Sequence, residues 1–340
     1  MTVATLPFLP AVSAFLVALA VAGLVLRAGI LDHPNARSSH ARPTPRGGGL
    51  GAVAGLFAGI ALVPLAAPAE AAALAGVLVC GGLAAGLGLI DDLFTLSERL
   101  KFAALLAISL AVALVAGPVT ELGLPLHWSL GLAGSVLWVF TTANAVNFMD
   151  GSDGLLAVVL IPASLALAAM GGEGVAPAGL VLAAALAGFA VWNMPFPGPR
   201  GRMFCGDVGS LGIAVIWAGL ALRWAAVGET GTVFLAPLLV MPLLGDVLLT
   251  MAARVKAGRS PFVAHRAHAY QLLIRMGRSH AAVAAIWGAM SLACGALALI
   301  GAAGPVWLKL AVLATGAAGF TLYHRQVRKQ AKAAGLDTVQ

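Results

Sequence analysis

Charged residues are scarce in this chain of 340 residues: Asp, Glu, Lys and Arg together make up 10% of it, against about 25% in typical soluble proteins. Apolar residues make up 61%, which is more than a soluble globular domain can bury. A disordered chain is excluded as well, because disorder requires low hydrophobicity. The composition therefore predicts an integral membrane protein.

Cysteine is also nearly absent. Cys80, Cys205 and Cys294 are far apart and odd in number, so they form neither a disulfide framework nor a metal-ligand pattern. The N-terminal apolar stretch lacks the basic start and the small-residue cleavage site of a signal peptide. We therefore interpret this stretch as the first membrane span.

Long apolar runs make up most of the chain. A helix of about 20 mostly apolar residues crosses a bilayer, and we expect an all-α fold, a polytopic membrane helical bundle with about 11 transmembrane helices. The expected spans lie near residues 6–27, 48–67, 71–90, 102–119, 126–146, 155–171, 175–193, 208–224, 232–253, 281–302 and 305–323.

The basic residues indicate an orientation. If the N-terminus lies outside, all Lys and Arg residues except Arg223 and Lys309 fall in inner loops or at inner helix ends. Cytoplasmic loops are enriched in Lys and Arg, so we expect a periplasmic N-terminus and a cytoplasmic C-terminus. The net charge of +7 then reflects topology, and no nucleic-acid partner is expected.

The aspartates fall on the same face as the basic residues. All eight lie in inner loops or at helix ends that face them, whereas four of the five glutamates lie in short outer loops. Ionisable groups at a membrane boundary are costly and are functional candidates. The aspartates are Asp32, Asp91, Asp92, Asp150, Asp153, Asp207, Asp246 and Asp337.

Asp91 and Asp92 are adjacent carboxylates at the end of the third expected span. Two neighbouring negative charges need a cation or a proton to coexist. Oxygen ligands of this kind suit Mg²⁺ or Mn²⁺ bound together with substrate phosphates. The alternative is a charged helix end that only terminates the span.

A polar stretch follows the fifth expected span. Asn144, Asn147 and Asp150 are three residues apart, so a helical continuation would place them on one face. Asp153 follows within a segment that contains two glycines. The stretch can offer amides and carboxylates to a polar ligand, or it is an ordinary polar turn.

Asp207 begins the eighth expected span, with Ser210 beside it. A helix N-terminus attracts phosphate, although an aspartate at this position can also be a simple N-cap. The segment is therefore a further candidate for a phosphate or metal site.

Two inner loops combine histidine with arginine. Residues 258–271 contain His265, Arg266 and His268, and residues 32–49 contain His40 and Arg46. Such loops suit a polyanionic ligand; the alternatives are a topology signal or lipid contact for the first and a rigid connector for the second. Together, the clusters indicate a diphosphate ligand bound from the cytoplasm with a bridging cation.

These motifs resemble the polyprenyl-phosphate N-acetylhexosamine-1-phosphate transferases, glycosyl transferase family 4. The resemblance runs from Asp32 to about Gln271 and rests on five ordered motifs. They are Asp32-x-Pro34-Asn35-x-Arg37 with Pro43-x-Pro45-x-Gly47-Gly48, Asp91-Asp92 with Leu96-Ser97-x-Arg99-x-Lys101, Asn147-x-x-Asp150-Gly151-x-Asp153-Gly154, Gly206-Asp207-x-Gly209-Ser210, and Arg259-Ser260-Pro261-Phe262 before the histidines.

The resemblance implies transfer of a sugar-1-phosphate from a UDP-N-acetylhexosamine to undecaprenyl phosphate, with release of UMP and a need for Mg²⁺, for which Mn²⁺ is an alternative. It implies a multi-pass protein of the bacterial inner membrane, surrounded by lipid, with its active site in the cytoplasm. We expect one transmembrane catalytic domain over residues 1–323 and a basic cytoplasmic tail over residues 324–340. A homodimer is compatible with this reading.

The resemblance also implies roles for individual residues. Asp91 and Asp92 are the expected catalytic pair, one of them deprotonating or orienting the lipid phosphate, and Asp207 is expected to hold Mg²⁺ together with Asp92. His268 is expected to contact the diphosphate as a catalytic residue. The expected substrate-binding residues are Asn147, Asp150, Asp153, Arg266, His265, Lys101, Arg46 and His40.

Two segments depart from the common family pattern. Residues 268–271 read His-Ala-Tyr-Gln where many members have His-x-His-His, and residues 37–40 read Arg-Ser-Ser-His where many have an Arg-Lys pair. Both resemble the branch that initiates O-antigen or related polysaccharides, which is compatible with a deoxy or otherwise modified donor sugar.

Asp246 in the ninth expected span is interpreted as structural. The alternative function is a secondary transporter of an anionic solute, which would carry ionisable groups near the bilayer midplane and an internal repeat.

Overall fold

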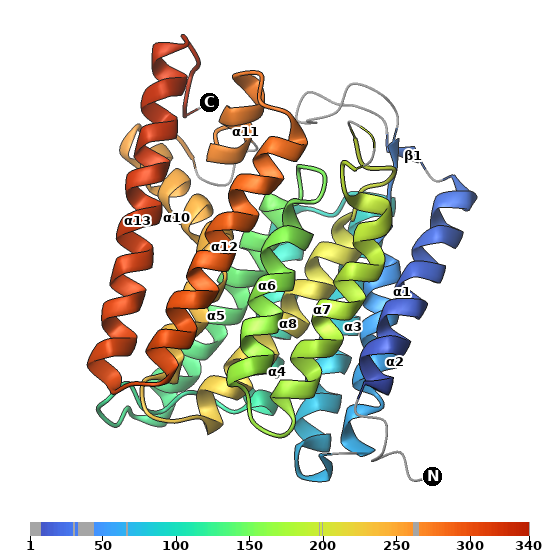
Figure 1. Ribbon diagram of the computed structural model, residues 1–340, viewed down its shortest axis with the longest axis vertical. Coiled ribbons are helices and arrows are strands. Elements are labelled where there is room, and N and C mark those ends of the chain that lie inside the picture. The colour runs from blue at the N-terminus through green and yellow to red at the C-terminus, as the bar shows by residue number, and fades with distance from the viewer. Residues whose placement is uncertain are drawn as a thin grey trace.

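The structure, a computed structural model, describes residues 8–29, 31–32, 44–65, 67–196, 198, 200–260 and 265–339. Within these residues the fold is a bundle of helices with one short antiparallel ribbon (Figure 1). The elements are α1 (Leu9–Ala28), β1 (Leu31–Asp32), β2 (Thr44–Pro45), α2 (Gly49–Ile60), η2 (Val63–Leu65), η3 (Pro68–Glu70), α3 (Ala71–Phe94), α4 (Glu98–Ala116), α5 (Trp128–Met149), α6 (Leu155–Met170), α7 (Val175–Asn193), α8 (Asp207–Val227), η4 (Thr232–Phe234), α9 (Leu235–Leu239), α10 (Met241–Lys256), α11 (Ala269–Arg275), α12 (His280–Ala302) and α13 (Val306–Ala333).

The all-α membrane bundle expected from the sequence is confirmed. Eight of the described helices are long and apolar enough to cross a membrane, and a ninth candidate is the bent pair formed by residues 232–239 and 241–256. Two shorter apolar helices, α2 and α6, coincide with the remaining expected spans. The count of eleven crossings and the orientation of the termini stay predictions.

Prolines account for the interruptions of the expected spans. A proline ring conflicts with the carbonyl four residues earlier in a continuing helix. Pro64 stands four residues after Ile60, where α2 ends. Pro242 stands four residues after Leu238, and the chain bends by 79° between α9 and α10.

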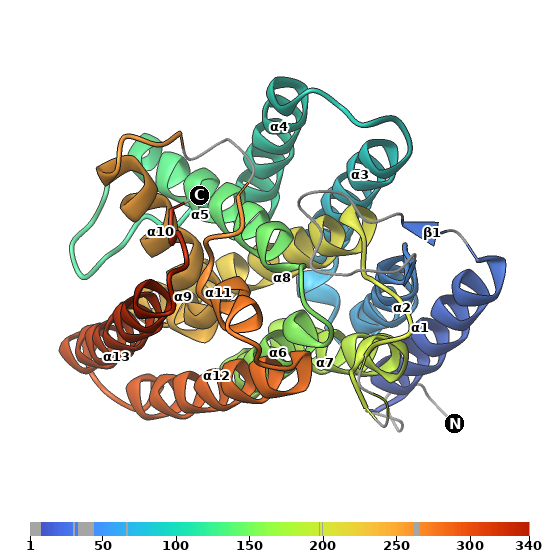
Figure 2. The ribbon, with the colours of Figure 1, turned by 90° about the horizontal axis from the view of Figure 1, so that it is seen from above.

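Helix α8 lies at the centre of the bundle (Figure 2). Of the most apolar 18 residues of α8, 78% are buried inside the bundle. The corresponding share is 17% for the peripheral helices α1 and α13. It packs against α2, α3, α4, α5 and α7. The first residue of α8 is therefore held in place from several sides.

The two ends of the bundle differ. β1, β2 and α11 lie at the upper end in Figure 1, where α3 and α5 end and α4, α6 and α8 begin; the first turn of α1 lies at the lower end and the last turn of α13 at the upper end. α13 continues without a break to Ala333, so the first part of the expected basic tail is helical. The division into one catalytic domain and a cytoplasmic tail stays a prediction.

Candidate active site

The close crossing of α3 and α8 brings aspartates from two distant motifs together at the upper end. Asp91 and Asp92 lie in the last turn of α3, and Asp207 is the first residue of α8. A Cβ added to Gly88 would lie only 2.2 Å from the carbonyl oxygen of Asp207, so this position requires glycine. Across the crossing, the Val208 N–H donates to Asp92 Oδ2 at 3.3 Å.

Lys101 joins the aspartates of the two helices. Its Nζ lies 2.7 Å from Asp91 Oδ2 and 2.5 Å from Asp207 Oδ2. The other Asp91 oxygen accepts the N–H of Leu96 at 2.8 Å, in the turn where Thr95 adopts φ 50°. Both oxygens of Asp91 are therefore engaged, whereas Asp92 keeps more of its carboxylate free for a ligand.

Arg46 reaches this region from the loop before α2. Its guanidinium donates to the Asp92 backbone carbonyl and lies 3.9 Å from Asp92 Oδ1. Three backbone hydrogen bonds hold the loop against the segment before α8: Phe204 N to Pro45 O at 2.8 Å, Gly48 N to Phe204 O at 2.9 Å, and Gly49 N to Cys205 O at 2.9 Å. The loop thus presents a cation beside the carboxylates.

The end of α5 completes this group. Asn147 Nδ2 donates to Asp207 Oδ1 at 3.0 Å and to Ser210 Oγ at 2.8 Å. Asp150 follows α5 directly. Burial, reinforced by the negative charges of Asp207 and Asp92, raises the pKa of Asp150 well above its usual range. We call Asp91, Asp92, Asp150 and Asp207 the carboxylate cluster.

The carboxylate cluster has a surplus of negative charge. Three of its carboxylates, Asp91, Asp92 and Asp207, face two cationic side chains, Lys101 and Arg46. Among the described residues, no three His, Cys, Asp or Glu side chains are grouped so as to hold a metal ion by themselves. Mg²⁺ usually binds one or two carboxylates together with substrate phosphates, and this donor set fits a cation shared with a phosphate ligand.

Asp153 stands three residues after Asp150, and, in addition to burial, its negative charge contributes to the raised pKa of Asp150. Asp153 Oδ2 accepts the Gly201 N–H at 3.1 Å and lies 3.7 Å from His280 Nδ1. The Asp153 side chain is buried, and its Oδ1 has no hydrogen-bond partner among the described residues. Such an orphaned oxygen is available to a ligand.

Residues 265–268, which we call the histidine loop, lie directly before α11, and Tyr270 of α11 adjoins the cluster. The rings of His265 and His268 are 4.8 Å apart, and His268 stacks on Tyr270 at 6.1 Å. The Tyr270 hydroxyl donates to the Phe148 carbonyl at 3.4 Å, and a Cβ on Gly151 would lie 2.1 Å from it. The first turn of α11, which follows the loop, therefore contacts the turn that carries Asp150.

The structure brings seven of the expected site residues together: Asp91, Asp92, Asp150, Asp207, Asn147, Lys101 and Arg46. His265, Arg266 and His268 lie in the adjoining histidine loop, where the Arg266 carbonyl accepts from Arg275. Asp153 occupies its own buried position. His40 lies outside the described residues. The roles of these residues stay predictions.

Three side chains in these contacts were not predicted as site residues. Ser210 and Tyr270 stand within the motifs around Asp207 and His268, so the sequence did contain a signal for them. His280 carried none, because it stands alone at the start of α12, 127 residues from Asp153.

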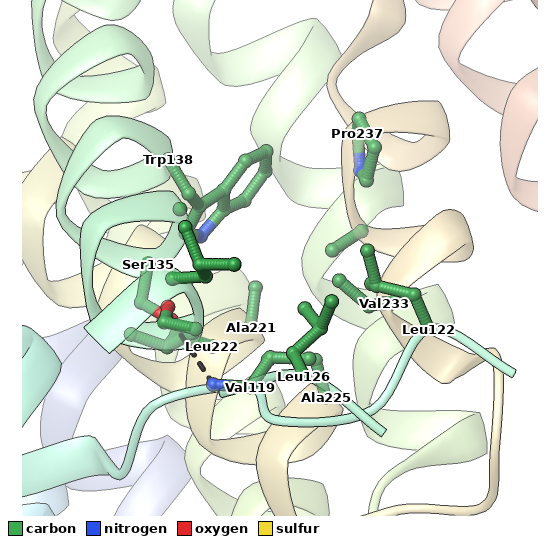
Figure 3. Close-up of a pocket in the computed structure, with 14 residues that line it drawn as sticks. Val119, Leu122, Leu126, Ser135, Trp138, Ala221, Leu222, Ala225, Val233 and Pro237 are labelled. Carbon is green, nitrogen blue, oxygen red and sulfur yellow. Dashed lines mark hydrogen bonds between the residues drawn. The ribbon is translucent and has the colours of Figure 1, made fainter. Parts of the chain in front are cut away.

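An apolar cavity of about 220 Å³ lies at the lower end, between the α4–α5 connection, α5, α8 and α9 (Figure 3). The Val119 N–H donates to Ser135 Oγ at 3.0 Å, drawn as a dashed line in Figure 3, and Trp138 Nε1 donates to the Ala218 carbonyl at 3.0 Å. None of its lining residues is ionisable. The cavity suits an apolar ligand and no acid–base chemistry.

Comparison with known proteins agrees with the motifs. The family model of glycosyl transferase family 4 matches residues 74–225. A decaprenyl-phosphate N-acetylglucosaminephosphotransferase of Mycobacterium tuberculosis is 29% identical over 77% of this chain and 73% of its own length. Undecaprenyl-phosphate α-N-acetylglucosaminyl 1-phosphate transferases of Yersinia pestis and Escherichia coli are 28% and 29% identical, over 85% and 74% of this chain and 82% and 71% of their own lengths. The matched segment holds the carboxylate cluster, and over this segment the chain is similar to glycosyl transferase family 4.

Proposed function

We propose that the chain transfers an N-acetylhexosamine-1-phosphate from a UDP-sugar to undecaprenyl phosphate, with release of UMP. The observation that carries the proposal is the meeting of Asp92 and Asp207 with Lys101 and Arg46 at one end of an apolar bundle. The names of the relatives, which join a polyprenyl phosphate to N-acetylglucosamine, support it. We further propose that the reaction initiates O-antigen or a related envelope polysaccharide on the cytoplasmic side of the inner membrane.

In this reaction an oxygen of the lipid phosphate attacks the phosphorus that carries the sugar, and the bond from that phosphorus to UMP breaks. Asp92 and Asp207 are the residues that would hold Mg²⁺, which when bound would neutralise charge on the phosphates. Arg46 adds a guanidinium suited to paired phosphate oxygens. Asp92 orients or deprotonates the lipid phosphate, while Asp91 positions Lys101.

The polyprenyl chain needs an apolar path, and the lower cavity supports this part of the proposal. Trp138, which lines the cavity, precedes Asn147 by nine residues on α5, a rise of about 14 Å. An isoprenoid chain with its phosphate at the carboxylate cluster could follow α5 into the cavity. Gly134 also lines the cavity, and a Cβ there would meet no atom within 4 Å.

The experiment supplies membranes containing the protein with undecaprenyl phosphate, Mg²⁺ and a panel of UDP-N-acetylhexosamines, and measures UMP release. We expect release that requires lipid and metal and is lost in Asp92→Asn. Glu173→Gln, a matched loss of a carboxylate at an exposed position, should retain it. Gly134→Leu should raise the KM for the lipid and leave the KM for the nucleotide-sugar unchanged. Folded protein that releases no UMP from any donor, or that releases it without lipid, contradicts the proposal.

A further inference from the structure

Asp246 is a buried carboxylate that faces the histidine loop from α10. It is 0% exposed and lies in the first half of α10, just after the 79° bend. Its Oδ1 accepts the N–H of Ala269 at 2.9 Å, and its Oδ2 accepts the N–H of Tyr270 at 3.3 Å. One side chain therefore fixes the first two residues of α11.

The same carboxylate lies between two histidine rings. Asp246 Oδ1 is 3.6 Å from His268 Nδ1 and 3.6 Å from His324 Nε2 of α13. Thr250 Oγ1 donates to Asp246 Oδ1 at 3.1 Å and lies 3.2 Å from His324 Nε2. All four side chains are buried, so α10, α13 and the histidine loop meet at one carboxylate.

His268 Nδ1 is buried and has no hydrogen-bond partner among the described residues. Asp246 Oδ1 faces it at 3.6 Å, just beyond hydrogen-bond range. Such bonds are often long in enzymes without substrate and shorten when substrate binds. A carboxylate behind one ring nitrogen fixes the orientation of the other.

Tyr270 extends the effect of Asp246 to the carboxylate cluster. Its backbone is held by Asp246, and its hydroxyl contacts Phe148 and Gly151, next to Asp150. A displacement of the start of α11 would therefore reach both His268 and the turn after α5.

Resting on the proposed transfer reaction, we propose that Asp246 is a positioning residue that orients His268 and the start of α11 at the edge of the active site. A buried carboxylate is costly unless its partners are in place. Here the partners include His268, which is expected to contact the diphosphate in the proposed reaction. Asp246 acts through His268 and contacts no substrate.

A double-mutant cycle in the UMP-release assay separates positioning from general stabilisation. We expect Asp246→Asn to lower kcat by about 100-fold, the order expected for a misplacement of about 1 Å, with the KM for the lipid unchanged. In a His268→Gln background the same change should cost less than about threefold, because the residue through which it acts is already gone. Full additivity of the two losses overturns the proposal.

A second measurement needs no catalytic activity. Diethyl pyrocarbonate modifies accessible histidines, and His268 is 3% exposed in the structure. In folded protein, mass spectrometry should find His268 modified at least about tenfold faster in Asp246→Asn than in wild type. The control is Ser291→Ala, which removes a buried hydrogen bond to the Val159 carbonyl in α6 and should leave the rate unchanged. An unchanged rate in Asp246→Asn overturns the positioning role, whereas absence of UMP release by wild type contradicts the proposed function alone.

Discussion

Replacing Gly88 with alanine should separate the two halves of the carboxylate cluster. The new Cβ would lie 2.2 Å from the Asp207 carbonyl oxygen and 2.6 Å from Val208 N, whereas ordinary contact begins at 3.4 Å. Both neighbours are backbone atoms of α8, so no side chain can rotate away. The helices must therefore move apart by about 1 Å, a misplacement that costs about 100-fold in rate when it affects reacting groups.

We expect kcat for UMP release to fall by about 100-fold in Gly88→Ala, and the free energy of unfolding by about 1–3 kcal/mol, as for overpacked sites. Gly86→Ala is the matched control, because the same substitution on the same helix meets no atom within 4 Å. Steady-state kinetics and thermal unfolding of both variants test the reasoning. If Gly88→Ala turns over as fast as Gly86→Ala, the α3–α8 crossing does not set the geometry of the site.

Three further predictions concern charged side chains. Lys101→Gln should abolish most UMP release at ordinary Mg²⁺ concentrations, because Asp91 and Asp207 lose the ammonium that both contact; kinetics over a Mg²⁺ titration check this, and full activity would contradict it. Arg223→Gln, which breaks a bidentate ion pair at the lower end with two contacts of 2.8 Å, should lower the free energy of unfolding by about 1–3 kcal/mol and leave kcat unchanged. Burial is the main cause that lowers the pKa of His265 to about 3 from 6.5, so the unfolded chain binds this proton first and the protein loses stability as pH falls below about 6.5. The melting temperature of His265→Gln should therefore fall less than that of wild type between about pH 7.5 and about pH 5, and equal falls would refute the assignment.

Hydrophobic run length was sufficient to place the helices, because each of the expected spans coincides with a helix or a helix pair. It could not predict how α9 and α10 bend by 79°, since the run from 232 to 253 stays apolar through the break. Pro242 does predict a break at this point, because its ring conflicts with the Leu238 carbonyl in a continuous helix. The number of crossings depends on the bilayer and not on the run length alone.

The motifs predicted which residues would gather, but spacing along a helix did not predict their final partners. Asn144 and Asn147 lie three residues apart in α5, as expected, but Asn144 Nδ2 donates to the Phe140 carbonyl of its own helix, and Asn147 binds Asp207. Asp153 has its own partners, Gly201 and His280, because the helix ends at Met149 and the chain leaves the helical spacing before Asp153. Contacts between distant elements, such as Asp153 with His280, carry no local signal.

The interpretation of Asp246 as merely structural came from its position within a span. The sequence separates it from His268, and the return of the chain from α10 to the start of α11 brings the two within 3.6 Å. A carboxylate inside an apolar run was a sign of a buried partner. Which residue is that partner could be seen only in the folded structure, where His268 and His324 lie beside Asp246.

The loop before α2 is attached to the segment before α8 through main-chain atoms alone in the three hydrogen bonds that join Pro45, Gly48 and Gly49 to Phe204 and Cys205. Main-chain hydrogen bonds of this kind do not depend on which side chains are present. The exception is Gly49, where an added Cβ would lie 2.3 Å from Gly209 Cα. These three hydrogen bonds, which we call the seam, do not depend on residues 33–43. Those residues could therefore be exchanged for the corresponding residues of a relative while Arg46 keeps its place. Chimeras joined at the seam would test whether this loop can be exchanged between similar proteins without redesign of the bundle.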